Sequence, residues 1–174
     1  MRTMQTVSYQ PIAADLIEAN RLYYVSSMRS QGAIKIFTLS VLVFSGIAIS
    51  EVWNEGIYSI VTAFFVGLLL GTVFVIGALS VQYFLIPRLA RKNFDQQKTL
   101  QDHVELVWTD VEIIRKTARS QSTLSWSDFR KMYRSKQVVV LMQSDRAFNH
   151  IPLRALTPEQ TASIEEYFAR AHLG

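Results

Sequence analysis

The sequence predicts an α+β membrane protein, in which a two-helix transmembrane hairpin is joined to a small antiparallel β domain closed by a C-terminal helix. Three observations predict this class. Residues 36–50 and 56–87 of the 174-residue chain carry no charge. After residue 98 the apolar residues recur with the period of a strand, and the chain ends in an amphipathic helix. We therefore expect three parts, residues 1–32, 33–87 and 93–174.

Both uncharged stretches are long enough to cross a bilayer, which takes roughly 20 apolar residues. The first predicted helix spans about 33–50, and its only charge, Lys35, lies near one end. The second spans about 57–86, and Tyr83 followed by Arg88 is typical of a helix that leaves the membrane. Buried helices of a soluble protein are the alternative, but such helices rarely run so far without a charge. We predict two membrane-spanning helices.

A short acidic turn separates the predicted helices, so they form an antiparallel hairpin. Residues 51–56 contain Glu51 and Glu55 and neither Lys nor Arg. The outer flanks are basic, with Arg21, Arg29, Lys35, Arg88, Arg91 and Lys92. Because loops rich in Lys and Arg stay on the cytoplasmic side, we expect a multi-pass protein with both termini in the cytoplasm.

The second predicted helix carries Gly67 and Gly71 at a spacing that lets two helices approach closely. Two uses remain open. The glycines could pack the hairpin itself, or they could form a seam between copies of the chain in a homo-oligomer. No Asp, Glu, Arg or His lies in the middle of either helix. An ion or proton path usually needs such a residue, so transport by this chain alone is not expected.

The segment before the apolar stretches predicts a strand over residues 6–9 and an amphipathic helix over residues 13–28. The early Asp15 and the late Arg21 suit the helix dipole. This helix could lie on the bilayer surface or against the C-terminal domain, and the pattern does not choose between them.

Short apolar runs separated by turns predict an antiparallel sheet after residue 98. The predicted strands span residues 104–108, 112–118, 122–126, 138–142 and 148–151. Thr157, Pro158 and Gln160 then predict a capped helix start. The apolar stripe of this helix comprises Ile164, Tyr167, Phe168 and Ala171. A curved antiparallel sheet closed by a C-terminal helix is the plan of a pleckstrin-homology-like (PH-like) domain.

Two segments of this domain are specific enough to suggest a family. They are Leu124-Ser125-Trp126-Ser127-Asp128-Phe129, and Ile151-Pro152-Leu153-Arg154-Ala155-Leu156 leading into Thr157-Pro158-Glu159. With them, the whole chain resembles the YcxB-like family of bacterial membrane proteins. It departs from the family at Asp110-Val111, where members often have an acidic residue followed by Gly, and at Leu156, where they often have Phe. The resemblance implies the fold and a location in the bacterial cytoplasmic (inner) membrane. It transfers no functional residue, because the family has no established biochemical activity.

The sequence shows no pattern of a catalytic, cofactor or metal site. There is no cysteine, and His103, His150 and His172 lack the spacing of metal ligands. The serines lie outside any nucleophile motif. We therefore expect no enzyme activity and no cofactor. Trp126 is expected in the core, and Asp128 is expected to cap a turn through a backbone hydrogen bond.

One basic cluster stands out, consisting of Arg130, Lys131, Arg134 and Lys136. It could contact anionic lipid headgroups or a partner, each charge near a membrane surface contributing roughly 1 kcal/mol, or it could be a solvated face. Nucleic acid is not an expected partner, since residues 93–174 hold eleven Lys and Arg against ten Asp and Glu. A nucleic-acid binder concentrates positive charge on its soluble part.

These patterns favour a non-catalytic integral membrane protein whose cytoplasmic PH-like domain binds a protein, a peptide or a lipid headgroup in a regulatory or scaffolding role. The motivation is an anchor joined to a binding-type fold without a catalytic constellation. A membrane-perturbing or pore-forming oligomer is the first alternative, and a membrane-tethered enzyme is the second. The sequence predicts the lipid bilayer as a partner and does not identify a protein partner.

Overall fold

The computed structural model describes residues 4–28, 31–145 and 147–173. They divide into two compact units. One unit combines Met1–Tyr23 with Pro87–Gly174, and the other is Tyr24–Ile86. The N-terminal strand and the first turns of the helix that follows therefore belong to the same unit as the C-terminal domain. From the sequence, these segments are expected in two separate parts, residues 1–32 and 93–174.

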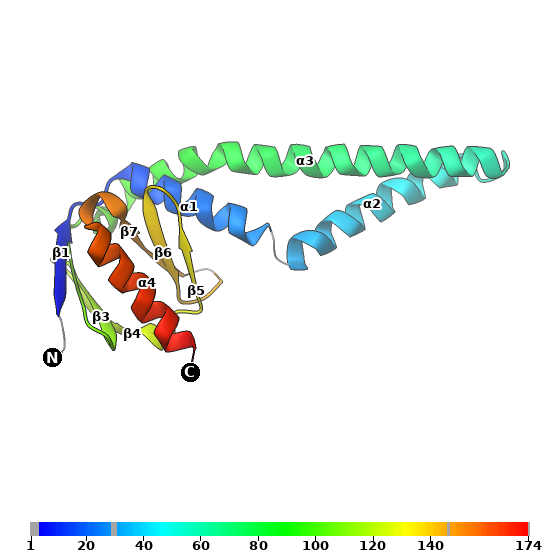
Figure 1. The fold of residues 1–174 in the computed structure, drawn as a ribbon. Coiled ribbons are helices and arrows are strands. Elements are labelled where there is room, and N and C mark those ends of the chain that lie inside the picture. Colours follow the sequence, from blue (N-terminus) through cyan, green and yellow to red (C-terminus); the bar gives the residue numbers. More distant parts are fainter. Residues whose placement is uncertain (1–3, 29–30, 146, 174) are drawn as a thin grey trace. The chain divides into compact units, whose positions relative to one another are not determined.

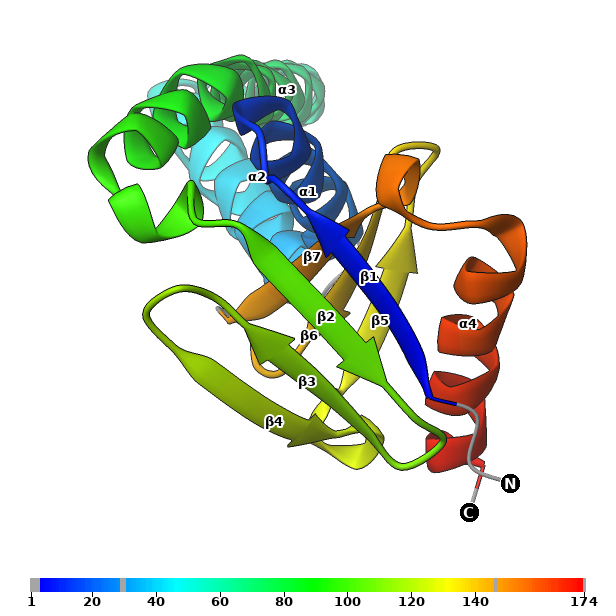
Figure 2. The same cartoon turned by 90° about the vertical axis from the view of Figure 1, so that its left-hand side faces the viewer.

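The first unit contains two antiparallel sheets, which face each other in Figure 2. The first sheet has the order β1 (Gln5–Tyr9), β2 (Val104–Trp108), β3 (Glu112–Lys116) and β4 (Gln121–Ser125). The second has the order β5 (Lys131–Arg134), β6 (Val138–Met142) and β7 (Phe148–Pro152). Short 3-10 turns cover Lys98–Leu100, Trp126–Asp128 and Leu153–Ala155. The α+β class with antiparallel sheets and a C-terminal helix is confirmed.

The strands of the structure differ from the expected ones in two main respects. The strand predicted over residues 112–118 ends at Lys116, because Thr117 starts a turn in which its backbone N–H donates to the carbonyl of Ser120 at 2.8 Å. Strand β5 was not predicted. Its four residues, Lys131, Met132, Tyr133 and Arg134, were interpreted as part of a basic cluster because two of them are charged. The strand is nevertheless paired along its length with β6.

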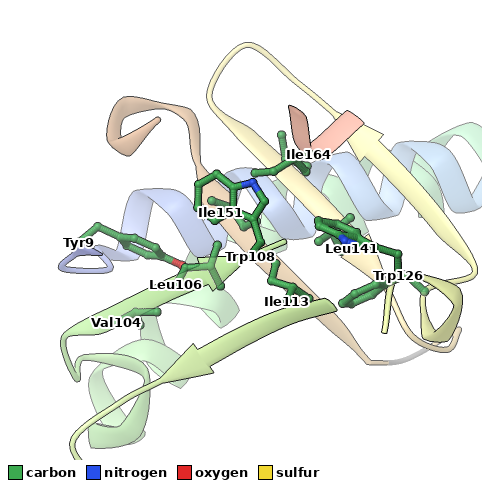
Figure 3. Close-up of a cluster of buried hydrophobic side chains, with 11 residues drawn as sticks. Tyr9, Val104, Leu106, Trp108, Ile113, Trp126, Leu141, Ile151 and Ile164 are labelled. Atoms are coloured by element: carbon green, nitrogen blue, oxygen red, sulfur yellow. The ribbon is translucent and has the colours of Figure 1, made fainter. Parts of the chain in front are cut away.

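The core lies between the two sheets and is built from fully buried large side chains (Figure 3). Its members are Tyr9, Val104, Leu106, Trp108, Ile113, Trp126, Phe129, Val139, Leu141, Ile151 and Ile164. The Trp126 indole donates to the carbonyl of Thr109 at 2.9 Å, so its polar edge is satisfied inside the core. Core placement of Trp126 is confirmed.

The C-terminal helix α4 (Pro158–His172) packs against this core and begins as the sequence predicts. The Thr157 hydroxyl accepts from the backbone N–H of Gln160 at 3.2 Å, and the Gln160 side chain accepts from the backbone N–H of Thr157 at 3.0 Å. Ala171 is exposed, so its inclusion in the apolar stripe was wrong. His172, although exposed, stacks on Phe168, and its Nε2 lies 2.6 Å from the carbonyl oxygen of Phe129.

Strand β6 is buried along its whole length because both of its faces are covered. Val139 and Leu141 face the core between the sheets. Val138, Val140 and Met142 form a second cluster with Ala19, Leu22 and Tyr23 of helix α1 (Ala13–Ser27). The first part of α1 therefore packs on the C-terminal domain, which was one of the two positions that the sequence left open. Two-sided burial also explains why β6 reads as a continuous apolar run.

An ion pair holds the start of α1 against the domain. Asp15, which is 7% exposed, accepts from Arg154 Nη2 at 2.6 Å and from the backbone N–H of Ile12 at 3.0 Å. Arg154 Nη2 also donates to the carbonyl of Gln10 at 2.8 Å. Arg154 belongs to one of the two segments that carry the family resemblance, and the structure gives this residue a structural role.

We expect Arg154→Met to lower the free energy of unfolding by about 2 kcal/mol, because it leaves the buried Asp15 carboxylate without its cation while the half-exposed arginine limits the loss. Urea unfolding of the full chain, followed by tryptophan fluorescence, measures this. Arg170→Met is the matched control, since Arg170 pairs with Glu166 on an exposed helix face and should contribute less than about 0.5 kcal/mol. Equal losses for the two variants would contradict the anchoring role of Arg154.

The second unit holds α2 (Gln31–Glu51) and most of α3 (Ile57–Gln96). Gly56 has φ of 102°, a left-handed conformation that suits glycine, and it ends the turn between them. The second predicted helix was expected to end near Ile86, and this end was wrong. The helix continues through Pro87 to Gln96, because the residues after Pro87 include strong helix formers such as Leu89 and Ala90.

Both helices are long and apolar enough to cross a membrane, and their apolar side chains are mostly exposed. Only 6% of the residues in Ile34–Glu51 and 17% of those in the most apolar part of α3 are buried. Exposed side chains include Ile36, Leu39, Leu42, Ile47, Phe65, Leu69, Val73 and Phe74. The core helix of a soluble protein would instead be mostly buried.

Helices α2 and α3 form the two arms of the hairpin in Figure 1, and Gly67 and Gly71 of α3 lie close to the backbone of α2. A Cβ atom on Gly67 would lie 2.7 Å from the backbone nitrogen of Ser45 and 2.8 Å from the carbonyl oxygen of Phe44. One on Gly71 would lie 3.0 Å from the Cα of Val41. The glycine face therefore lies against α2 of the same chain, which is the first of the two uses that the sequence left open.

We expect Gly67→Val to lower the midpoint of thermal unfolding in mild detergent by several degrees, because overpacking a tight contact costs about 1–3 kcal/mol. Gly77→Val is the matched control, since nothing lies within 4 Å of a Cβ atom at Gly77. The midpoint is measured as loss of monodisperse protein after heating. A larger shift for Gly77→Val than for Gly67→Val would contradict the close approach.

Candidate functional site

The first unit contains a polar groove of about 440 Å³, which we call the amide groove. Its volume falls within the range of small-molecule sites, about 300–1,000 Å³. The lining side chains come from α1, from the end of α3 and the turn after it, from β3, and from β7 with the turn before it. They are Leu16, Asn20, Asn93, Gln97, Leu100, Arg115, Gln143, Ala147, Phe148, Asn149 and His150.

Arg115 is a charged residue on the inner face of the first sheet. It lies on the same face of β3 as Ile113, which is 4% exposed, because strand residues alternate between faces. Its partner across the sheet is Leu106, a core residue that is 3% exposed. Among the residues that the structure describes, none forms a hydrogen bond or an ion pair with the Arg115 guanidinium. Arg115 is half-buried and lines the groove, so its guanidinium donors are available to an anionic ligand there.

Asn149 occupies the equivalent position on the second sheet. It pairs with Leu141 and lies on the same face of β7 as Ile151, both of which belong to the core. The side-chain amides of Asn149, Asn93, Gln97 and Gln143 all line the amide groove, and none has a hydrogen-bond partner within residues 4–28, 31–145 and 147–173. The groove therefore offers several free donor and acceptor pairs beside one guanidinium.

His150 lines the groove and Tyr9 lies next to it, and neither side chain adds a charge at neutral pH. Burial lowers the pKa of His150 to about 4, and the nearby Arg115 lowers it as well, against an opposing effect of Asp15. Burial raises the pKa of Tyr9 to about 12, and the Tyr9 hydroxyl donates to the carbonyl of His150 at 3.3 Å. Both side chains are neutral at pH 7, which leaves Arg115 as the one formal charge among the described lining residues.

The basic cluster that the sequence singled out lies on strand β5 and in the residues beside it. Strand β5 is an edge strand, and its alternation places Lys131 and Arg134 on opposite faces. Arg134 Nη1 lies 2.5 Å from Glu165 Oε1 of α4, while Arg130, Lys131 and Lys136 are exposed. Lysine on an exposed edge also discourages pairing with other strands, so the cluster has a structural explanation.

The remaining residues that the sequence considered have local structural roles. The Asp128 carboxylate accepts from the backbone N–H of Ser125 at 2.8 Å, which confirms the predicted turn cap. His103 Nε2 lies 2.5 Å from the hydroxyl of Ser8. In the described part of the chain, no three His, Asp or Glu side chains come together in a way that could hold a metal ion.

Sequence reasoning missed the residues of the amide groove. For Arg115 a signal existed, because residues 113 and 115 must share a face of the predicted strand. Ile113 and Ile114 are both apolar, however, so the alternation alone does not show which face is buried. No pattern in the sequence identifies the unpaired amides as a site, since Asn93 is far in sequence from Gln143 and Asn149 and comes near them only in the fold.

The stability of the fold should fall as the pH drops from about 6.5 toward 4. The unfolded chain binds a proton at His150 below its ordinary pKa of 6.5, whereas the folded ring stays neutral until about 4. Between pH 7 and pH 5 we expect this residue to cost the wild type about 2 kcal/mol of unfolding free energy. His150→Gln should remove that part of the pH dependence in urea unfolding, whereas His103→Gln, at an exposed site, should keep it. Identical pH dependence in wild type and His150→Gln would contradict the burial of this ring.

Comparison with known protein families confirms the resemblance for the C-terminal region. The family model described as YcxB-like protein matches residues 108–168. The match includes Arg115, Asn149 and His150 of the amide groove, and it does not include Asn93 or Gln97. A search of curated proteins gave no match. The chain thus carries a YcxB-like region within the unit that holds both sheets and α4.

Proposed function

We propose that this chain is a non-catalytic membrane protein of the bacterial cytoplasmic membrane, in which the apolar hairpin anchors a cytoplasmic PH-like binding domain. The domain would hold a ligand or partner in a regulatory or scaffolding role. One observation carries the proposal: the two apolar helices expose their side chains, and the chain on both sides of them folds into one domain.

Exposed apolar side chains along α2 and α3 support insertion into lipid. A soluble monomer rarely exposes a contiguous apolar patch larger than a few hundred Å². Leu39 and Leu42 of α2 are 63% and 62% exposed, and Leu69 of α3 is 63% exposed. Helices satisfy their own backbone hydrogen bonds, so such a surface is stable in lipid and unfavourable in water.

The pairing of β1 with β2 supports placing both ends of the hairpin on the same side of the membrane. Strand β1 precedes the apolar helices and β2 follows them, yet they pair over five residues from Gln5↔Trp108 to Tyr9↔Val104. A pair of strands cannot form across a bilayer, so the chain between them must cross an even number of times. The acidic turn and the basic flanks then favour the cytoplasm for the domain.

The arrangement of the first unit supports a PH-like domain with a binding role. It has two antiparallel sheets of four and three strands and a C-terminal helix packed on the core. The amide groove offers unpaired polar groups on this frame, which is the pattern of a ligand site rather than of a filled core.

Labelling of single cysteines tests the anchoring and the orientation, since the native chain has no cysteine. In spheroplasts, a membrane-impermeant maleimide should label Asn54→Cys, in the turn between α2 and α3, without permeabilisation. It should label Gln121→Cys, at the exposed start of β4, only after lysis. Labelling of both sites only after lysis would refute the anchoring, and the reverse pattern would refute the orientation.

A further inference from the structure

The amide groove carries an inference beyond anchoring, and its first step is Arg115. This guanidinium occupies an inner-face position beside Leu106 and Ile113, which are drawn in Figure 3. Four arginines of the first unit pair with a carboxylate of the chain: Arg119 with Asp102, Arg134 with Glu165, Arg154 with Asp15 and Arg170 with Glu166. The described residues supply no carboxylate to Arg115, so its half-buried guanidinium is available to an anion from outside the chain.

The second step is the chemistry of the amides. A side-chain amide carries both a donor and an acceptor, as a hydroxyl group does, so amides pair well with hydroxylated ligands. Asn93, Gln97, Gln143 and Asn149 line the groove with these groups unpaired. The lining amides therefore favour a ligand that carries several hydroxyl groups beside its anionic group.

The third step limits the charge of that anion to one. Arg115 is the only formal charge among the lining residues that the structure describes, and these include no lysine. Gln97 follows the last residue of α3, Gln96, and the C-terminal end of a helix carries partial negative charge that opposes a multiply charged anion. A phosphodiester has a single negative charge and two free oxygens, which match the two parallel donors of a guanidinium.

We propose that the amide groove binds a phosphodiester with attached hydroxyl groups, with Arg115 on the phosphate oxygens and the amides on the hydroxyls. This rests on the proposed function, because it names the ligand of the anchored domain. The same chemistry has two sources, a phospholipid headgroup and its water-soluble counterpart. The groove residue Asn93 lies close in sequence to the part of α3 expected in the membrane. It follows Ile86, near the end of the uncharged stretch, by about two turns of helix, which favours a lipid headgroup as one source.

Titration calorimetry tests the soluble source. Full-length protein in mild detergent is titrated with glycerophosphoglycerol, a singly charged phosphodiester with hydroxyl groups. We expect saturable binding that Arg115→Gln weakens about tenfold or more, as for loss of a charged hydrogen bond. Lys116→Gln is the matched control, because it removes the same charge from the neighbouring residue on the opposite face of β3 and should leave the affinity within about twofold.

Protection of a cysteine in the groove tests the lipid source. Ala147→Cys places a thiol among the exposed lining residues of an otherwise cysteine-free chain. In nanodiscs, phosphatidylglycerol should slow its reaction with a maleimide relative to phosphatidylcholine, whose headgroup lacks hydroxyls. Protection by phosphatidylglycerol identifies a headgroup ligand, and protection by glycerophosphoglycerol alone identifies a soluble one. Either protection should disappear in the Arg115→Gln background.

The proposal is overturned if neither compound binds or protects, or if Arg115→Gln behaves like Lys116→Gln. Asn149→Ala guards against a folding artefact, because it removes an amide contact without touching the cation and should also weaken binding at unchanged thermal stability. Failure here leaves the anchoring intact, since labelling of Asn54→Cys involves no ligand. Conversely, the calorimetry does not depend on membrane insertion.

Discussion

The pairing of β1 with β2 is the constraint on which the rest of the molecule depends. These strands lie on either side of the apolar helices in sequence, and they pair in register from Gln5 to Tyr9 and from Trp108 to Val104. The N-terminal segment is therefore part of the C-terminal domain, and the helices are an insertion in one folded unit. Under this constraint the ends of the insertion return to the same domain, which a hairpin of two spans satisfies.

The same unit gives structural roles to Trp126, Asp128 and Arg154, which lie in the two segments that carry the family resemblance. Trp126 fills the core, Asp128 caps its turn, and Arg154 fixes Asp15 at the start of α1. With α1 in place, β6 is covered on both faces. Packing does not explain the polar residues of the amide groove, which are Arg115 on the inner face of its sheet and the unpaired side-chain amides. A ligand-binding role is assigned to these residues because packing does not account for them.

The sequence predicts those parts whose signals are local. The apolar run Val138–Met142 is a strand, and Thr157 with Gln160 forms the cap of α4, as their chemistry requires. Signals that depend on tertiary contacts were lost. Strand β5 was not predicted because basic residues along an edge strand resemble a solvated loop, and α3 continues past Pro87 although proline usually ends a helix.

Of the residues in the candidate site, only Arg115 could have been inferred from the alternation of a strand. Ile113 and Ile114 are adjacent and both apolar, so the alternation did not show which face of the strand is buried. The contact of Gly67 with Ser45 shows the same limit, since glycine spacing alone did not distinguish a hairpin from a dimer.

The central claim is that lipid surrounds the apolar helices inserted into this domain. A spin label at Leu69→Cys, in full-length protein reconstituted into bilayers, measures this directly through its collision rates with oxygen and with a water-soluble nickel complex. We expect faster relaxation by oxygen than by nickel at this site, and the opposite order for a label at Gln121→Cys. Greater access to nickel at Leu69, or shielding from both reagents, would place this helix in water or inside protein and would contradict the account.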